Sequence, residues 1–245
     1  MKLKELVSIC NEIAPFELQA SWDNSGLLVG TLEDTVEHIA LSIDIDEEQL
    51  LALPNGSVII THHPLIFGKL KKLDFSAYPA KYLQIMIQKN ISHIAMHTNF
   101  DLAHLNSYVG KEVFGFENCE SDEHLITGNL TFNTFDDILD FIQEKLSLKT
   151  IKYVKCSEEI NKIALCTGAG ASLLESVNAD LFLTGDIKYH EAMQAKALGI
   201  SLIDITHYTS ERYFSTIMYD ELKKKGISAI ISDSKDPFKY KQEKA

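Results

Sequence analysis

The sequence has no apolar run long enough to cross a membrane and no excess of positive charge. A membrane-spanning helix needs about 20 consecutive apolar residues, and charged or polar residues interrupt each apolar stretch well before that length. The formal net charge is -12 at pH 7, so long-range electrostatics would repel a phosphate backbone. We therefore expect a protein outside the membrane that does not bind nucleic acid through a general basic surface.

Cysteine is scarce, and the cysteines are far apart in the sequence. The chain has four of them, at Cys10, Cys119, Cys156 and Cys166. They form neither the C-x-x-C pair of thiolate metal sites and redox motifs nor the dense framework of small secreted proteins. The N-terminal segment carries Glu5, Asn11 and Glu12 among its apolar positions, which is unlike a signal peptide. We expect reduced thiols and a cytoplasmic location.

Short apolar runs alternate with segments of helical periodicity along the chain. Strands are expected near residues 27–30, 39–43, 58–61, 91–97, 125–132, 151–155, 162–166, 181–185, 201–205 and 227–232. Helices are expected at residues 3–13, 46–53, 78–89, 103–114, from Thr134 onward, 189–198 and 209–224. Such alternation is typical of βαβ units and a largely parallel sheet. The polar segment 115–123 is expected to be a boundary, after which a second small α/β unit begins.

Most histidines fall where strands are expected to end. His62 and His63 close one apolar run, His97 closes another, and His190 and His207 follow two more. In open α/β sheets ligands bind beyond the carboxyl ends of the strands, because loops from several strands converge there. Pro64 favours an extended conformation for the residue before it, so the two adjacent rings can diverge toward two ions. The alternative is that one ring is packed in the core and the other is solvated.

Two carboxylates accompany these imidazoles. Asp101 lies just past the strand that ends at His97, although capping of the next helix would also explain an Asp there. His207 and Glu211 are four residues apart, so on a helix they share one face and can reach a common ion, although such pairs also occur as simple surface residues. Imidazole and carboxylate donors without thiolate favour a pair of zinc, manganese, iron or cobalt ions, and paired ions of this kind favour hydrolysis.

An ordered set of motifs carries a family resemblance across nearly the whole chain. These motifs are SWDNSGLLVG (21–30), THHPLIF (61–67), HTNFD (97–101), TGDIKYHEA (184–192) and THYTSE (206–211). Together they resemble the Nif-three-like dinuclear metal-centre family, whose members are also called GTP cyclohydrolase type-two homologues. No single motif is specific, but the ordered set is.

The resemblance implies a site for two divalent metal ions (zinc, iron or manganese), with ligands at His62, His63, Asp101, His207 and Glu211. These are the five residues that the spacing suggests. It also implies an α/β (α+β) fold of two interlinked domains with mixed sheets flanked by helices, without the inserted domain of longer members, and a ring-shaped homo-hexamer. We assign the metal-binding domain to residues 1–120 and 200–245 and the second domain to residues 121–199.

Three further residues are candidate catalytic groups. His97 is either a residue that orients a ligand or substrate or simply a packed side chain. Asp186 and His190 lie in a motif that the family places near the metals, where they could act as acid or base, although Asp186 could also cap a helix. Trp22 could offer a flat face to a ring or anchor its loop. The glycines of residues 166–172 could bind an anion or form a tight turn.

These residues support two expectations of function. The first is a dinuclear-metal-dependent hydrolase, GTP cyclohydrolase-like, that acts on a nucleotide-like or phosphorylated small molecule. The second is a metal-organised binding or regulatory hexamer without catalytic turnover. Measured turnover with added metal, or co-purification of a partner, would discriminate between them.

Overall fold

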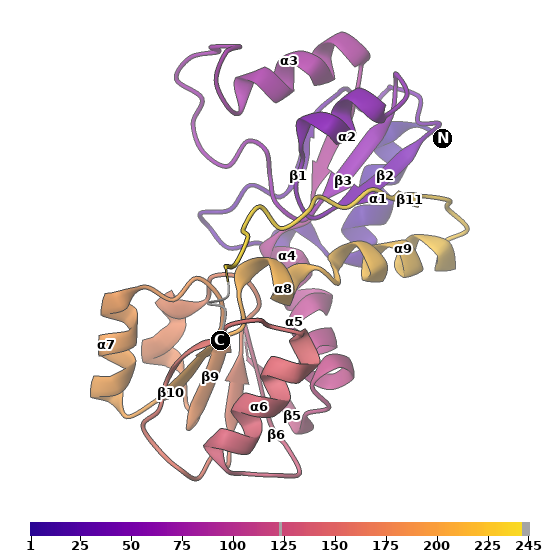
Figure 1. Ribbon diagram of the computed structural model, residues 1–245. Coiled ribbons are helices and arrows are strands. Elements are labelled where there is room, and N and C mark those ends of the chain that lie inside the picture. The colour runs from indigo at the N-terminus through magenta and orange to yellow at the C-terminus, as the bar shows by residue number, and fades with distance from the viewer. Residues whose placement is uncertain (123, 242–245) are drawn as a thin grey trace. The chain divides into compact units, whose positions relative to one another are not determined.

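The computed structural model describes residues 1–122 and 124–241 (Figure 1). The chain forms two compact units: the first consists of Met1–Ala103 and Tyr213–Lys235, and the second of His104–Arg212 with residues 236–241. The chain changes unit after Ala103 and after Arg212. From the sequence, these changes are expected after residues 120 and 199. Within the described residues, no helix combines the length and apolar character needed to cross a bilayer.

The first unit contains a five-stranded sheet. In spatial order its strands are β1 (Gly26–Val29), β4 (Ser92–Ala95), β3 (Val58–Thr61), β2 (Ile39–Ser42) and β11 (Ile230–Ile231). Strand β1 runs antiparallel to β4, and the other neighbours are parallel. Every residue of β2, β3 and β4 is buried, because helices and loops cover both faces of a parallel sheet. This explains why these strands are continuous apolar runs in the sequence.

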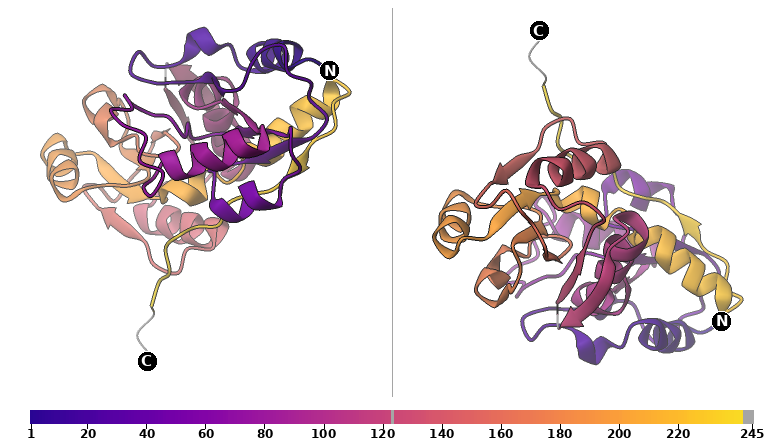
Figure 2. Two further views of the ribbon diagram at one scale, coloured as in Figure 1. Left: turned by 90° about the horizontal axis from the view of Figure 1, so that it is seen from above. Right: turned by 90° about the horizontal axis from the view of Figure 1, so that it is seen from below.

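Two pairs of helices flank this sheet. Helices α2 (Glu47–Ala52) and α3 (Ala80–Lys89) contact each other (Figure 2), and their buried residues pack with β2 and β3 in one apolar cluster. Helix α9 (Phe214–Lys224) packs against β2 and β11. Helix α1 (Leu3–Ile13) buries one apolar stripe. The short 3-10 helix η1 (Phe16–Leu18) follows α1 in the chain. The N-terminus of α2 is fixed by a capping box between Asp46 and Gln49, which satisfies two backbone donors.

The second unit contains a six-stranded mixed sheet. In spatial order its strands are β5 (Glu117–Asp122), β6 (Leu125–Asn129), β8 (Ile163–Leu165), β9 (Leu181–Thr184), β10 (Ser201–Asp204) and β7 (Lys152–Val154). Strands β8, β9 and β10 are parallel, and the remaining pairs are antiparallel. Helix α7 (Tyr189–Leu198) and the 3-10 helix η4 (Ala171–Ser176) pack on one face. The mixed α/β fold expected from the sequence is therefore confirmed.

Further helices complete the structure. The segment that follows β4 is helical throughout, with α4 (Thr98–Phe100), the π-helix η2 (Asp101–Leu105), α5 (Asn106–Tyr108) and the π-helix η3 (Val109–Val113). Helix α6 (Phe135–Leu146) begins at Thr134, whose hydroxyl accepts a hydrogen bond from the Asp137 backbone N–H, as the sequence predicts. The expected helix 209–224 is instead two helices, α8 (His207–Glu211) and α9, interrupted at Arg212 and Tyr213.

Candidate metal centre

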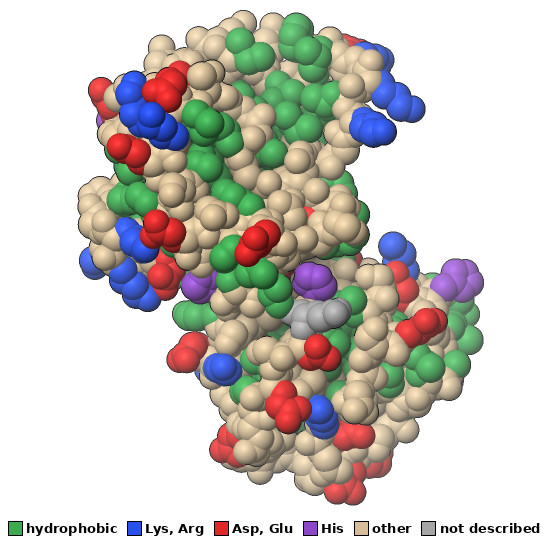
Figure 3. Space-filling model, turned by 180° about the vertical axis from the view of Figure 1, so that it is seen from behind, with side chains coloured by type: hydrophobic (Ala, Val, Ile, Leu, Met, Phe, Trp, Pro, Cys, Tyr) green, Lys and Arg blue, Asp and Glu red, His purple; other side chains and the backbone are tan. Residues whose placement is uncertain are grey.

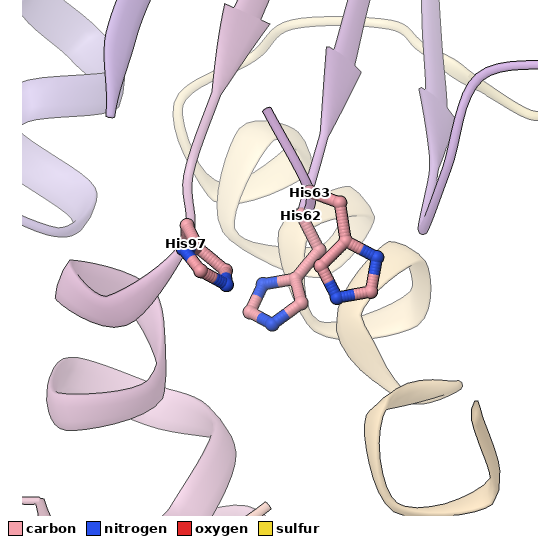
Figure 4. Close-up of side chains that lie close together, drawn as sticks. All are labelled: His62, His63 and His97. Atoms are coloured by element: carbon pink, nitrogen blue, oxygen red, sulfur yellow. The ribbon is translucent and has the colours of Figure 1, made fainter. Parts of the chain in front are cut away.

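Three imidazoles meet at the carboxyl ends of two neighbouring parallel strands in the first unit. His62 and His63 directly follow β3, and His97 lies two residues beyond the end of β4 (Figure 4). The ring centroids are 5.0 Å apart for His62 and His63, 5.2 Å for His62 and His97, and 5.6 Å for His63 and His97. One nitrogen from each ring lies within 4.8 Å of the others, so the three side chains form one cluster.

His62 and Asp101 have the geometry of two ligands of one cation. The Nδ1 atom of His62 lies 2.9 Å from the carbonyl oxygen of Met96, and because a carbonyl only accepts, Nδ1 carries the proton and Nε2 presents its lone pair. That Nε2 lies 3.5 Å from Oδ1 of Asp101. Two ligands of a tetrahedral zinc ion are about 3.3 Å apart. Asp101 does not cap α4, because His97 occupies the N-cap position.

His63 and His97 are oriented by carboxylates. The Nδ1 atom of His63 donates to Oδ1 of Asp44 at 2.8 Å, and Nδ1 of His97 donates to Oδ1 of Asp23 at 2.8 Å. Metal-binding histidines commonly use one ring nitrogen in this way, which fixes the ring and increases the basicity of the other nitrogen. Both rings are therefore prepared to bind a metal ion, or to carry a proton, through Nε2.

Asp23 is held as a fixed negative charge. Burial raises its pKa, but the hydrogen bonds from His97 and Thr98, the positive charge of His97 and the backbone N–H of Asn24 outweigh that effect, and the pKa lies below its usual range. The backbone N–H of Asn24 lies 2.7 Å from Oδ1, and that of Thr98 lies 3.1 Å from Oδ2. Asp23 thus fixes both the orientation of His97 and the loop that precedes β1.

The second unit carries the other two predicted ligands. His207 and Glu211 lie on one face of α8, which follows β10, and Nε2 of His207 is 3.1 Å from Oε2 of Glu211. Asp186, which follows the parallel neighbour β9, accepts a hydrogen bond of 2.8 Å from Nδ1 of His207. Glu211 is only 2% exposed, and a buried carboxylate is costly without a compensating cation. The donor set therefore fits a divalent ion.

A glycine loop shapes the surroundings of Glu211. Gly168 has a φ of +65°, and a Cβ at this position would overlap Oε1 of Glu211. Its backbone N–H donates to Oγ of Ser210 at 3.0 Å. From the sequence, this loop is expected to be an anion cradle or a tight turn. In the structure, the absence of a Cβ at Gly168 leaves the space that the Glu211 carboxylate occupies.

The predicted residues are thus placed as follows. His62, His63 and Asp101 lie together with His97 in the first unit, and His207 and Glu211 lie together with Asp186 in the second. His190 lies in the first turn of α7, is exposed, and has a ring contact of 5.3 Å with Tyr189. Among the described residues it joins neither cluster of side chains that could hold a metal ion.

Asp44, the supporting role of Asp23 and the space that Gly168 leaves for Glu211 are not among the features expected from the sequence. Asp44 carried a detectable signal, because it follows β2 at the same sheet edge as His62 and His63. Asp23 lies in a loop, and its role depends on a contact with His97 that is 74 residues away in the sequence. No local pattern predicts such a contact.

The comparisons with known proteins agree with this description. The family model described as Duf34/NIF3 (NGG1p interacting factor 3) matches residues 1–237. A Campylobacter jejuni protein named GTP cyclohydrolase 1 type 2 homolog is 44% identical, over 98% of this chain and 100% of the relative. A Helicobacter pylori J99 protein named GTP cyclohydrolase 1 type 2 is 43% identical, over 96% and 97%. A crystal structure of a Staphylococcus aureus hypothetical protein superposes with a TM-score of 0.85 at 26% identity, over 98% and 99%. The chain belongs to the Duf34/NIF3 family.

Proposed function

We propose that this protein is a metal-dependent hydrolase in which His62, His63, Asp101, His207 and Glu211 hold two divalent metal ions. One observation carries the proposal: His62, His63, His97 and His207 each direct Nδ1 at an oxygen acceptor, so that Nε2 is the ring nitrogen that would face a metal ion. Four rings oriented in the same way are typical of metal ligands. Packed core histidines have no need of this common orientation.

The donor chemistry indicates zinc, iron or manganese, since every donor is an imidazole nitrogen or a carboxylate oxygen. Bound ions of this kind would supply Lewis acidity, which polarises a substrate oxygen and makes water more acidic. His97 would move a proton at Nε2, taking it from the attacking water and returning it to the leaving group, while Asp23 holds its ring. Asp186 would orient His207. His190, which is exposed in the first turn of α7, stays a candidate acid or base.

The substrate that we propose to test first is GTP. The 43% identical Helicobacter relative is named GTP cyclohydrolase 1 type 2, which supports hydrolysis of a purine nucleotide. The broader class of candidate substrates is that of phosphorylated small molecules. The protein should be purified, supplied with zinc, manganese or iron(II), and assayed with GTP and a panel of phosphoesters.

The test needs two variants. His62→Ala with His63→Ala should abolish metal-dependent turnover, while Lys241→Ala, an exposed residue outside the cluster, should leave it unchanged. Elemental analysis measures the metal content of each protein, and circular dichroism measures whether each protein is folded. The absence of metal-dependent turnover with every compound would refute the hydrolase.

A second candidate is a metal-organised binding or regulatory hexamer. The family description, NGG1p interacting factor 3, names a protein interaction rather than a reaction. In that case light scattering should show six copies, and a stoichiometric partner should co-purify and be lost in the double histidine variant. A partner that still co-purifies with the double variant would show that its binding does not depend on the metals.

A further inference from the structure

Two large aromatic side chains are exposed beside His97. Scattered hydrophobic side chains among charged ones are ordinary at a protein surface (Figure 3). Trp22 and Phe67 differ, since they are 62% and 54% exposed and their ring centroids are 5.9 Å apart. Each centroid also lies 6.1 Å from that of His97. The three rings therefore form a triangle at the edge of the imidazole cluster.

The loops that carry these rings are fixed, although the rings themselves are exposed. The side-chain amide of Asn24 donates to the carbonyl oxygen of Ile66, at 2.5 Å, and so joins the Trp22 loop to the Phe67 loop. On the other side of Trp22, the Ala20 N–H donates to Oγ1 of Thr98 at 2.9 Å. A rigid loop that presents an aromatic ring to solvent loses little conformational freedom when a ligand binds.

We propose that Trp22 and Phe67 form a stacking site for the planar heteroaromatic ring of a ligand, such as a nucleobase, whose reacting group lies at His97. This inference rests on the proposed function and specifies its substrate class. The planes of the two rings are inclined at 54°, so a planar ring can stack on one and meet the other at its edge, the two arrangements that aromatic rings prefer. Base stacking on an aromatic side chain tolerates different bases, because every base has a π-face.

The chain offers a direct probe of this site, because Trp22 is its only tryptophan. Protein fluorescence should be followed during titration with guanosine monophosphate, adenosine monophosphate and ribose 5-phosphate. We expect saturable quenching by both nucleotides and none by ribose 5-phosphate, which has the phosphate and the sugar but no base. Binding by ribose 5-phosphate with equal affinity would overturn the proposal.

Variants test the contribution of each ring. Phe67→Leu should weaken nucleotide binding by about 5- to 100-fold, whereas Phe238→Leu, a control at a phenylalanine that is 70% exposed, should not change it. By calorimetry, Trp22→Phe should retain most of the affinity that Trp22→Leu loses. Unchanged affinity in both leucine variants at Trp22 and Phe67 would overturn the proposal. Quenching that increases with protein concentration rather than with nucleotide concentration would also overturn the proposal, because a second copy of the chain would then cover the rings.

The stacking site and the hydrolase can fail separately. Metal content and turnover are measured on the same samples as the quenching. Quenching without metal-dependent turnover would keep the stacking site and refute the hydrolase. Turnover without quenching, and without any effect of Phe67→Leu, would keep the hydrolase and refute the stacking site.

Discussion

Nδ1 of His207 lies 2.8 Å from Oδ2 of Asp186, and Asp186 makes this contact from a left-handed backbone conformation with φ of +55°. Asp and Asn tolerate that conformation better than other side chains do. The carboxylate keeps a proton on Nδ1, so that Nε2 of His207 faces Glu211, 3.1 Å away. The pair therefore determines which nitrogen is offered to a metal ion.

Asp186→Asn should weaken metal binding without unfolding the protein. Asparagine fits the same backbone, but its NH₂ group can face Nδ1 as a donor and move the ring proton to Nε2. We expect a loss of about 10- to 100-fold in metal affinity, measured with cobalt(II) by visible absorption, and thermal unfolding close to that of the wild type. An unchanged cobalt titration would show that Asp186 does not orient His207.

Glu211→Gln should lower the metal content, because the amide removes the negative charge while keeping the size of the side chain. The carboxylate is nearly fully buried, so without metal its charge is costly, and the metal-free variant should be at least as stable as the metal-free wild type. Added metal should stabilise the wild type by about 2.7 kcal/mol at 100 times the dissociation constant, and the variant far less. Elemental analysis and urea unfolding measure both effects, with Lys241→Ala as the control. Full metal occupancy in the variant would refute the assignment of Glu211.

The sequence predicts the buried strands and the position of the imidazoles well, for one physical reason. Strands β2, β3 and β4 are covered on both faces, so they are continuous apolar runs. Their ends are then recognisable, and His62, His63 and His97 stand at those ends. Adjacent parallel strands end at the same edge of a sheet, so the clustering of these rings follows from the strand pattern.

Features that depend on the surface or on distant contacts were not predictable. Strand β5 is mostly exposed and polar, so its segment, 117–122, has the composition of a loop and is expected to be a boundary. The two π-helices after β4 have no recognised sequence pattern. The contact of His63 with Asp44 spans 19 residues and that of Gly168 with Ser210 spans 42, so only the tertiary structure reveals them.

Gly168→Ala should impair the metal site more than its backbone strain alone explains. The new Cβ would overlap Oε1 of Glu211, and since that oxygen ends a flexible side chain, the carboxylate would move. Gly199→Ala is the matched control, because Gly199 has a φ of +75° and no atom within 4 Å of an added Cβ. Both variants should lose about 1–2 kcal/mol of stability from left-handed alanine, but only Gly168→Ala should lose cobalt affinity. Equal cobalt titrations would show that this glycine serves the turn alone.

His93 should make the protein less stable as the pH falls. Its ring is fully buried in β4, and Nε2 lies 2.7 Å from the hydroxyl of Thr61, which itself donates to the carbonyl oxygen of His63 at 2.6 Å. Nε2 must therefore be the donor in the first contact, and the ring is neutral. Burial lowers its pKa from 6.5 to about 3, because a charged imidazole would lose its hydration.

The direction of this change in stability with pH follows from the number of protons that the folded and unfolded states bind. Between pH 6.5 and about 3 the unfolded chain protonates this histidine and the folded chain does not, so acid favours unfolding there and has no effect through this group above pH 6.5. The contribution approaches about 1.4 kcal/mol per pH unit in the middle of that range. Urea unfolding in a chelating buffer from pH 7.5 to 4.5 should show a steeper loss for the wild type than for His93→Gln, whose amide can donate to Thr61 but does not titrate. The free energies of the two proteins should converge as the pH falls, and parallel curves would mean that His93 is solvated or charged in the folded protein.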